Sequence, residues 1–448
     1  MLTAPFEGYW VVPGFHGHSW VSLFQRILLF PLPAVTLYLV LRRKDRLAML
    51  PLGLITAWII WVLFTFVLFS PHSYYYLYYT WEQIAGFLLI LSFWYLARFQ
   101  SFSRITTIAS LLIYYGATLF LSQWEIQTHH HLGASTEHHT AIPTAFSYGP
   151  NHLGAAVALI IPFVSLLFLL KRSWWVLAAS ILFSLWGIYI LYKTGSRAGE
   201  LAVMLEAIGL AVLLPKRWKY YAIASIGALF VIIGAALFLV VHLPATDMPF
   251  ALVKFRHLAH IFNGAASHSS SQGPGSFKIR IALLESGFRA LWHHPWGLGP
   301  RGAEGYYAYY VHHKSPYNTY GVIDAHNMWL EVAIDFGWLG ISLYTGFYGL
   351  LLLGLYRLRR HTDATLRYIS WAGFPALIGF VIGSLSPSSV MIGFNIMWIV
   401  YGLAMMAIYQ NAQLIKTAPH YPSDIRTSGF VRTDMTSLPF GFHHSSHK

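Results

Sequence analysis

The feature that most constrains this chain is a series of apolar runs, each of roughly twenty residues, that recurs along its length. A helix of that length crosses a hydrocarbon core of about 30 Å. Backbone in lipid must satisfy its own hydrogen bonds, so only helices and closed barrels span a membrane, and continuous rather than alternating runs indicate helices. Only 10% of the residues are charged, against about a quarter in a soluble domain. The sequence therefore predicts an all-α, polytopic membrane protein.

We expect about eleven transmembrane helices from these runs. A twelfth would have to lie in residues 1–18, where Pro13 and Gly14 argue against it. The expected helices cover 19–41, 47–70, 81–97, 105–122, 151–170, 174–192, 199–214, 220–241, 327–355, 368–385 and 390–409.

Basic residues give the expected orientation of these helices. They gather on every second connection, as in Arg42–Arg46, Lys171–Arg172 and Arg357–Arg360, and the positive-inside rule assigns those connections to the cytoplasm. The N-terminus is then outside and the C-terminus inside. Because topology accounts for most of the net charge of +13, we expect no nucleic-acid partner.

The connection 242–326 falls on the outer face and is far longer than an ordinary loop, so we expect it to be functional or disordered. Its middle, Gly264–Gly275, is rich in serine, glycine and histidine and is typical of a flexible segment. Apolar residues then follow helical spacing over 278–292, which predicts an amphipathic helix on the membrane surface. The expected regions are transmembrane helices in 1–241, this large extracytoplasmic loop, transmembrane helices in 327–410, and a disordered cytoplasmic tail in 411–448.

Cations on the expected outer face break the charge rule and are candidates for binding an anion. Arg197 follows Ser196 in a turn between two helices. Arg280 lies in the first turn of the amphipathic segment 278–292, Arg289 lies further along that segment, and Arg301 follows it. Guanidinium groups bind phosphate oxygens through paired hydrogen bonds, and a helix start adds backbone N–H donors. Snorkelling arginines and lipid headgroups are the ordinary alternatives to a pyrophosphate-linked lipid.

The other candidate for chemistry is His326, which precedes Asn327 at the start of an apolar helix. Neutral imidazole accepts a proton near neutral pH, so His326 is a plausible general base, and a helix cap is its ordinary alternative. Glu331 and Asp335 follow four residues apart on one face of that helix. Ionisable groups in a membrane helix face a cavity or a partner rather than lipid.

We expect no metal site and no cofactor. Cysteine is absent, which removes thiolate ligands and thiolate catalysis. Adjacent histidines such as His129–His131 rarely fix a coordination geometry, and we expect them to be solvated, together with Glu125 and Glu137.

Four motifs resemble one known family in the order in which they occur. The string His326-Asn327-x-x-Leu330-x-x-x-x-Asp335-x-Gly337-x-x-Gly340 resembles the signature of the O-antigen ligase and polymerase superfamily. The helix entry Tyr148–Gly154, the turn Thr194–Gly199 and the segment Arg280–Gly299 are similar to further elements of that family. The similarity spans about residues 140–410.

The resemblance implies a metal-independent glycosyltransferase with a GT-C-like membrane fold. Its donor would be a glycan on undecaprenyl pyrophosphate, and its acceptor a hydroxyl of a glycan, glycolipid or protein outside the bacterial plasma membrane. Arg197 and Arg280 would bind the pyrophosphate, and His326 would deprotonate the acceptor; direct displacement would invert the anomeric carbon. Asp335 stands where the family commonly has Glu. Six further residues are expected to support these three: Arg301, Arg289, Asn327, Asp335, Glu331 and Ser196.

Other classes of function make different demands on the sequence. A transporter or flippase of the same lipid should show internal repeats and broken helices with charge near the midplane, whereas the unusual charges here gather at the expected outer rim. A metal-dependent membrane glycosyltransferase would need acidic ligands in an outer loop, and 71–80 contains none. Within the enzyme hypothesis, ligation, repeat-unit polymerisation and protein O-glycosylation remain open.

Overall fold

The structure is a computed structural model, and it describes residues 49–70, 74–97, 100–131, 142–147, 149–215, 220, 276–312, 322–387, 391 and 394–417. Within these ranges every regular element is a helix. The chain divides into two compact units, Met1–Ala412 and Gln413–Lys448, and the second is described only over 413–417. The expected helix 19–41, nearly all of 220–241, the segment Gly264–Gly275 and most of the tail lie outside the described residues.

The described helices follow the expected order along the chain. They are α3 (Met49–Phe69), α4 (Tyr74–Leu96), α5 (Gln100–Thr128), α6 (Pro150–Ser165), η3 (Leu167–Leu169), α7 (Trp174–Thr194), α8 (Arg197–Leu213), α11 (Ser276–His293), α12 (Gly302–His312), α13 (Met328–Leu358), α14 (Ala364–Gly383) and α15 (Asn395–Thr417). Of these, α11 is the expected amphipathic helix, and α12 has no counterpart among the expected helices.

Among the described residues, six stretches of helix are long and apolar enough to cross a membrane. They are Leu50–Phe69, Arg104–Thr128, Pro150–Leu169, Trp174–Thr194, Met328–Leu358 and Ala364–Gly383. Each coincides with a helix expected from the apolar runs. The chain is therefore a multi-pass membrane protein.

Three helices extend well beyond the apolar runs. Helix α5 covers Gln100–Thr128 rather than 105–122. Helix α4 begins at Tyr74, so the aromatic residues expected in an outer loop form its first turns. Helix α15 continues to Thr417 rather than ending near 409. Aromatic and polar residues lower the hydropathy of a helix end without interrupting its backbone hydrogen bonds, so hydropathy underestimates helix length there.

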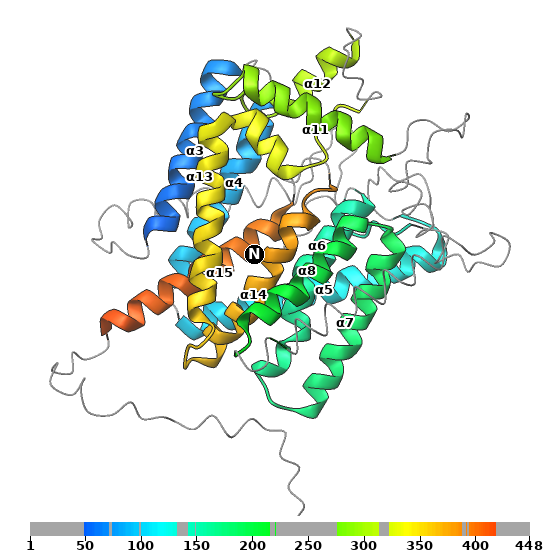
Figure 1. Ribbon diagram of the computed structural model, residues 1–448. Helices are drawn as coiled ribbons and strands as arrows, with labels where there is room; N and C mark the ends of the chain where they lie inside the picture. Colours follow the sequence, from blue (N-terminus) through cyan, green and yellow to red (C-terminus); the bar gives the residue numbers. More distant parts are fainter. Residues whose placement is uncertain are drawn as a thin grey trace, which may run out of the picture. The chain divides into compact units, whose positions relative to one another are not determined.

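Helices α6, α8 and α14 contact one another and lie side by side (Figure 1). Glycines allow the backbones of α8 and α14 to approach closely. A Cβ added to Gly379 of α14 would lie 2.7 Å from the carbonyl oxygen of Ala202, and one added to Gly209 of α8 would lie 2.9 Å from the Cα of Pro375. Small residues at such contacts are typical of membrane helices, because lipid provides no hydrophobic force to drive helices together.

Helix α13 is broken at Gly337, which has φ 66° and ψ −169°. Trp329, before the break, packs on Tyr344 and Tyr348, after it, with ring centroids 5.7 and 5.2 Å apart. The first segment therefore turns back on the second, as the sharp bend in Figure 1 shows. The expectation of one continuous helix over 327–355 is wrong at this point. Glycine adopts this left-handed backbone without steric cost, and apolar periodicity carries no signal of it.

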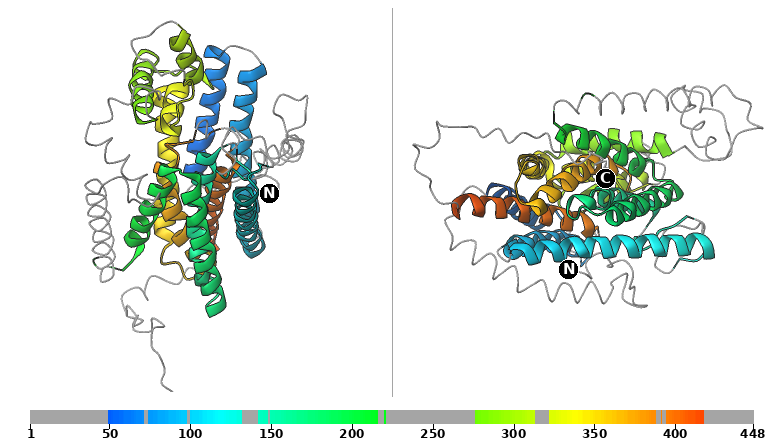
Figure 2. Two further views of the ribbon diagram at one scale, coloured as in Figure 1. Left: turned by 90° about the vertical axis from the view of Figure 1, so that its right-hand side faces the viewer. Right: turned by 90° about the horizontal axis from the view of Figure 1, so that it is seen from below.

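Helix α3 runs beside α13 and contacts it (Figure 2). At the break, the indole Nε1 of Trp61 in α3 donates a hydrogen bond of 2.7 Å to the carbonyl oxygen of Phe336. A break in a helix frees backbone groups that need another partner when they are buried. Trp61 is the partner of one of them.

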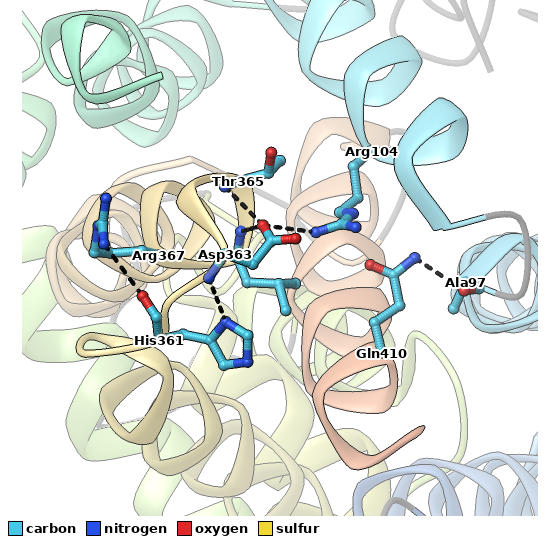
Figure 3. A network of polar contacts seen from close by, with 8 residues as sticks. Ala97, Arg104, His361, Asp363, Thr365, Arg367 and Gln410 are labelled. Atoms are coloured by element: carbon cyan, nitrogen blue, oxygen red, sulfur yellow. Dashed lines mark hydrogen bonds and ion pairs between the residues drawn. The ribbon is translucent and has the colours of Figure 1, made fainter. Parts of the chain in front are cut away.

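Neighbouring polar contacts join α5 to the start of α14 and α15 to the residue after α4 (Figure 3). Arg104 Nη1 of α5 donates to Asp363 Oδ1 at 3.0 Å. Asp363 is the N-cap of α14, and the same oxygen accepts the first backbone N–H groups of that helix. Gln410 Nε2 of α15 donates to the carbonyl oxygen of Ala97 at 2.9 Å. Because the Arg104 side chain is only 8% exposed, this ion pair is screened by water less than a surface pair would be.

We predict that Gly379→Leu will destabilise the fold and that Gly349→Leu will not. The larger side chain does not fit between α14 and α8, and overpacking costs about 1–3 kcal/mol. Gly349 in α13 is the matched control, because an added Cβ there meets no described atom within 4 Å. Thermal unfolding in detergent, followed by tryptophan fluorescence, should show a lower midpoint for Gly379→Leu alone. Equal midpoints for the two variants would contradict the close approach of the helices.

Candidate functional site

The candidate site is built around the break in α13. Residues 295–299, which follow α11, lie along the broken stretch and bond to it through their backbone. The hydrogen bonds run from Leu298 N to Ile334 O (3.0 Å), from Gly299 N to Asp335 O (2.8 Å) and from Trp338 N to Pro295 O (2.9 Å). This segment therefore satisfies backbone groups that the break leaves without a partner in the helix.

Two glycines make this pairing possible. Gly297 and Gly337 have φ of 92° and 66°, the left-handed region that favours glycine. A Cβ on Gly337 would overlap the carbonyl of Pro295, and one on Gly297 would overlap the backbone of α13. The His294–Gly299 turn and the Asp335-x-Gly337 signature, which are far apart in the sequence, thus form one structural unit.

Asp335 is buried and holds the start of α12. Its Oδ2 accepts the backbone N–H of Arg301 at 2.8 Å, and its Oδ1 accepts that of Ala303 at 2.7 Å. A carboxylate at a helix N-terminus satisfies free N–H groups and interacts favourably with the helix dipole. Asp335 thus contacts Arg301, one of the arginines expected to support the site, through the backbone N–H of that residue.

His326 lies one residue before the N-cap of α13. Asn327 is that cap, and its Oδ1 accepts the N–H groups of Trp329 and Leu330 at 3.1 and 3.2 Å. The capping role that was the alternative for His326 therefore belongs to Asn327. His326 has φ 47°, and a left-handed backbone costs a non-glycine residue about 1–3 kcal/mol, so surrounding contacts must hold it.

The environment of His326 favours its neutral form. Burial lowers the pKa of His326. The negative charge of Asp324 raises this pKa, and the positive charge of Arg280 lowers it further. The ring Nδ1 is buried and has no hydrogen-bond partner among the described residues. A neutral imidazole with a free nitrogen can accept a proton from a ligand.

Arg197 and Arg280 approach each other from α8 and α11. Arg197 is the exposed first residue of α8, whose N-cap is Ser196, and the Ser196 Oγ accepts the N–H of Gly199 at 3.4 Å. Burial lowers the pKa of Arg280, and the positive charge of Arg197 lowers it further. Like charges shift a pKa in this way only when the groups are near each other.

The turn that carries Arg197 packs against the start of α6. Gly195 has φ 66°, and a Cβ added to Gly154 would lie 2.5 Å from the Cβ of Ser196. The Tyr148–Gly154 motif and the Thr194–Gly199 turn therefore meet at Gly154. The glycine of the first motif leaves the space that the serine of the second occupies.

Ser386, just after α14, links the arginine to the histidine. Arg280 Nη2 donates to Ser386 Oγ at 3.0 Å, and the His326 ring hydrogen-bonds to the Ser386 backbone. Ser386 is buried, and sequence analysis did not single it out. The polar string Ser384-Leu385-Ser386-Pro387 after an apolar helix is its only signal, and that string does not point to His326. Three predicted residues, Arg197, Arg280 and His326, are thus brought together.

A second charged cluster consists of Arg301, Glu304 and Tyr79. The Arg301 guanidinium lies 3.9 Å from the centroid of the Tyr79 ring and pairs with Glu304. Burial lowers the pKa of Arg301 to about 10. Burial also raises the pKa of Glu304 to about 8, and Asp324 and Asp335 contribute to that rise. Asp324 acts on Arg301 as well as on His326, so it connects the two clusters electrostatically.

Two other predicted residues have different surroundings. Arg289 is exposed on the face of α11 opposite to Arg280, since nine residues correspond to about two and a half helical turns. Glu331 is buried in the first segment of α13, and its Oε2 has no hydrogen-bond partner within the described ranges.

Glu125, which the sequence suggested would be solvated, is fully buried. Its Oε2 accepts the backbone N–H groups of Thr144 and Ala145 at 2.7 and 2.8 Å, and its Oε1 lies 3.6 Å from His131 Nδ1. The expectation is wrong because the end of α5 and the residues before α6 enclose this carboxylate. Glu137 lies outside the described residues.

A cavity of about 340 Å³ adjoins the second cluster. Its lining residues are Tyr76, His294, Leu298, Gly302, Gly305, Tyr306 and Tyr309. Burial lowers the pKa of His294, and its ring lies 6.3 Å from that of Tyr306. In the described part of the chain, no three His, Asp or Glu side chains are grouped as a metal site.

Comparison with known proteins agrees with the resemblance seen in the sequence. The family model described as O-Antigen ligase matches residues 182–345, a stretch that contains Arg197, Arg280, His326 and Asp335. The teichuronic acid biosynthesis protein TuaE of Bacillus subtilis (strain 168) is 29% identical over 294 residues, which are 63% of this chain and 56% of that protein. The chain thus spans about half the length of this relative. The resemblance to the O-antigen ligase family is confirmed.

We predict that Asp335→Ala will loosen the start of α12. The substitution leaves the amides of Arg301 and Ala303 without an acceptor, which costs about 1–3 kcal/mol for each buried group. Hydrogen–deuterium exchange should become faster around residues 300–305, while peptides from α6 keep the wild-type rate. Asp335→Asn keeps one acceptor oxygen and should show a smaller change. Wild-type exchange at Arg301 in the alanine variant would refute the capping role of Asp335.

Proposed function

We propose that this relative of the O-antigen ligase family is a membrane glycosyltransferase of surface polysaccharide biosynthesis. It transfers a glycan from undecaprenyl pyrophosphate to an acceptor hydroxyl at the outer face of the bacterial plasma membrane. The observation that carries the proposal is the grouping of Arg197, Arg280 and His326, which come from three distant parts of the chain. The name of the relative TuaE, a teichuronic acid biosynthesis protein, supports a role in making a surface polymer.

Two guanidinium groups close enough to act on each other electrostatically suit a diphosphate. Each guanidinium can donate two parallel hydrogen bonds to phosphate oxygens, and the backbone N–H groups at the start of α8 add further donors. The pyrophosphate gains negative charge as it leaves the sugar, so cations fixed in place stabilise the transition state more than the ground state. Arg197 and Arg280 are the residues we assign to this role.

His326 supplies the base that the acceptor requires. The acceptor oxygen attacks the anomeric carbon, the bond from that carbon to the pyrophosphate oxygen breaks, and the hydroxyl proton passes to the imidazole. A single displacement inverts the anomeric configuration. Neutral imidazole is the active form, and the lowered pKa of His326 supports its presence at neutral pH. Ser386 contacts both the base and Arg280, so it positions them relative to each other.

The length of α13 supports an outward-facing site. From the break at Gly337 to Leu358, a helix extends about 31 Å, which is close to the thickness of a hydrocarbon core. The break and the start of α12 lie at the Gly337 end, and Arg357, Arg359 and Arg360 lie at the other end. The positive-inside rule assigns the basic end to the cytoplasm. This agrees with an eleven-helix topology in which residues 242–326 form an outer loop.

We predict that His326→Ala will abolish glycan transfer, and that Arg197→Ala and Arg280→Ala will weaken donor use. Loss of a general base costs about 10²–10⁴-fold in rate, and each arginine substitution should raise the KM for donor. Transfer from purified lipid-linked oligosaccharide is measured with and without chelator, and linkage analysis of the product should show an inverted anomeric carbon.

Arg172→Ala is the matched control, because this exposed arginine lies on the expected cytoplasmic side. Wild-type transfer by His326→Ala would remove His326 as the base, and loss of transfer on chelation would indicate a metal. Movement of intact donor across the bilayer without transfer would favour a flippase.

The rate of transfer should also depend on pH in a way that reports the pKa of His326. Because that pKa is lowered, kcat should remain constant near pH 7 and fall only below about 6.5, the ordinary value for histidine. Arg280→Met removes a positive charge that lowers the pKa of His326, so the fall in kcat should begin at a higher pH than in wild type. Asp324→Asn removes a charge that raises it, so the fall should begin at lower pH. Profiles at saturating donor that do not move in either variant would contradict this assignment.

A further inference from the structure

The cavity beside α12 has a lining that suits a sugar. Three tyrosines and a histidine, Tyr76, Tyr306, Tyr309 and His294, are among the residues that line it. Tyrosine combines an aromatic face with a polar hydroxyl, and histidine combines a flat ring with two nitrogens. A pyranose ring has the complementary character, with apolar C–H faces and a rim of hydroxyl groups. The volume of about 340 Å³ falls within the range of about 300–1,000 Å³ that is usual for small-ligand pockets.

The position of the cavity connects it to the proposed catalytic centre. Gly302 lines the cavity, and the residues on either side of it, Arg301 and Ala303, donate their backbone N–H groups to Asp335. Asp324 acts electrostatically on Arg301 and on His326. A chain of sugars with one end near His326 could therefore extend past the Arg301 cluster to the cavity.

We propose that this cavity binds a pyranose ring of the glycan substrate. This inference rests on the proposed glycosyltransferase function and assigns that function a sugar subsite away from the pyrophosphate. The sugar belongs either to the donor glycan or to the acceptor glycan, since the chemistry of recognition is the same.

Gly305 allows the cavity to be filled without disturbing its walls. A Cβ added at Gly305 would meet one described atom within 4 Å, the Tyr76 hydroxyl at an ordinary 3.5 Å, so alanine fits there. Tyr76 also lines the cavity, so a side chain at 305 extends toward it. Gly305→Phe should therefore occupy the space, and Gly305→Ala is the matched control that leaves most of it open. Gly302 does not serve this purpose, because a Cβ there would overlap Leu298.

The test uses the full-length protein in nanodiscs and two probes. One is lipid-linked oligosaccharide extracted from cells that lack this chain, and the other is undecaprenyl pyrophosphate without sugar. If the cavity binds donor glycan, Gly305→Phe should weaken binding of the first probe at least tenfold and leave the second unchanged. If it binds acceptor glycan, both affinities should stay at the wild-type value, and the KM for acceptor in membranes of the same cells should rise at least tenfold. Gly305→Ala should match wild type throughout.

A second pair of variants covers the case in which Gly305→Phe does not fold. Tyr309 is 58% exposed, so Tyr309→Ala removes a wall of the cavity at little cost to the fold, and Tyr220→Ala, at a residue 75% exposed, is its control. Only Tyr309→Ala should weaken glycan-dependent binding or raise the acceptor KM.

The sugar subsite and the glycosyltransferase function are contradicted by different results. If wild-type protein transfers glycan while Gly305→Phe and Tyr309→Ala change neither donor affinity nor acceptor KM, the cavity binds no sugar and the enzyme proposal stands. If wild-type protein transfers nothing, the proposed function fails, and an acceptor subsite fails with it. Equal binding of the two lipid probes by that protein would then reject a donor-glycan subsite as well.

Discussion

The break in α13 at Gly337 is the constraint on which the rest of the candidate site depends. It exposes a short stretch of backbone, and Trp61 of α3 and residues 295–299 take up the groups that are freed. Beside the break, the Asp335 carboxylate holds the start of α12 and so sets one wall of the cavity. Before it, the returning segment carries His326 to the end of α14. One left-handed glycine thus turns a single apolar run into a spanning helix and a support for the site.

The electrostatics of the site follow from burial. Charges interact more strongly at groups that are removed from water, so the charge of Arg197 acts on the partly buried Arg280, and the charges of Arg280 and Asp324 act on His326. The lowered pKa of His326 suits its role as a base, because His326 stays neutral at a pH at which a solvated histidine would be partly charged. For the arginines, proximity of like charges is unfavourable until an anion binds between them. The same arrangement therefore explains both proposed roles.

Sequence reasoning found the parts of this structure that depend on composition along one helix. Hydropathy located the six described spans, and apolar spacing located α11, expected over 278–292 and observed over Ser276–His293. It also named Arg197, Arg280 and His326, because cations and a histidine stand out in an apolar chain. It did not find α12, the break at Gly337 or Ser386. These depend on contacts between distant segments, such as the pairing of Gly297 with α13, and no local pattern encodes such contacts.

The polar network around Arg104 and Asp363 has a consequence for how α14 can move. One end of this helix is capped by Asp363 and anchored to α5, whereas the other end leads to Ser386, which contacts Arg280 and His326. That second end is held as well, because the Ser384 carbonyl accepts the N–H of Met328 at 3.1 Å and Gly379 packs closely against α8. With both ends fixed, α14 moves only together with its neighbours. The ion pair at Arg104 thus helps to set the position at which Ser386 meets Arg280 and His326.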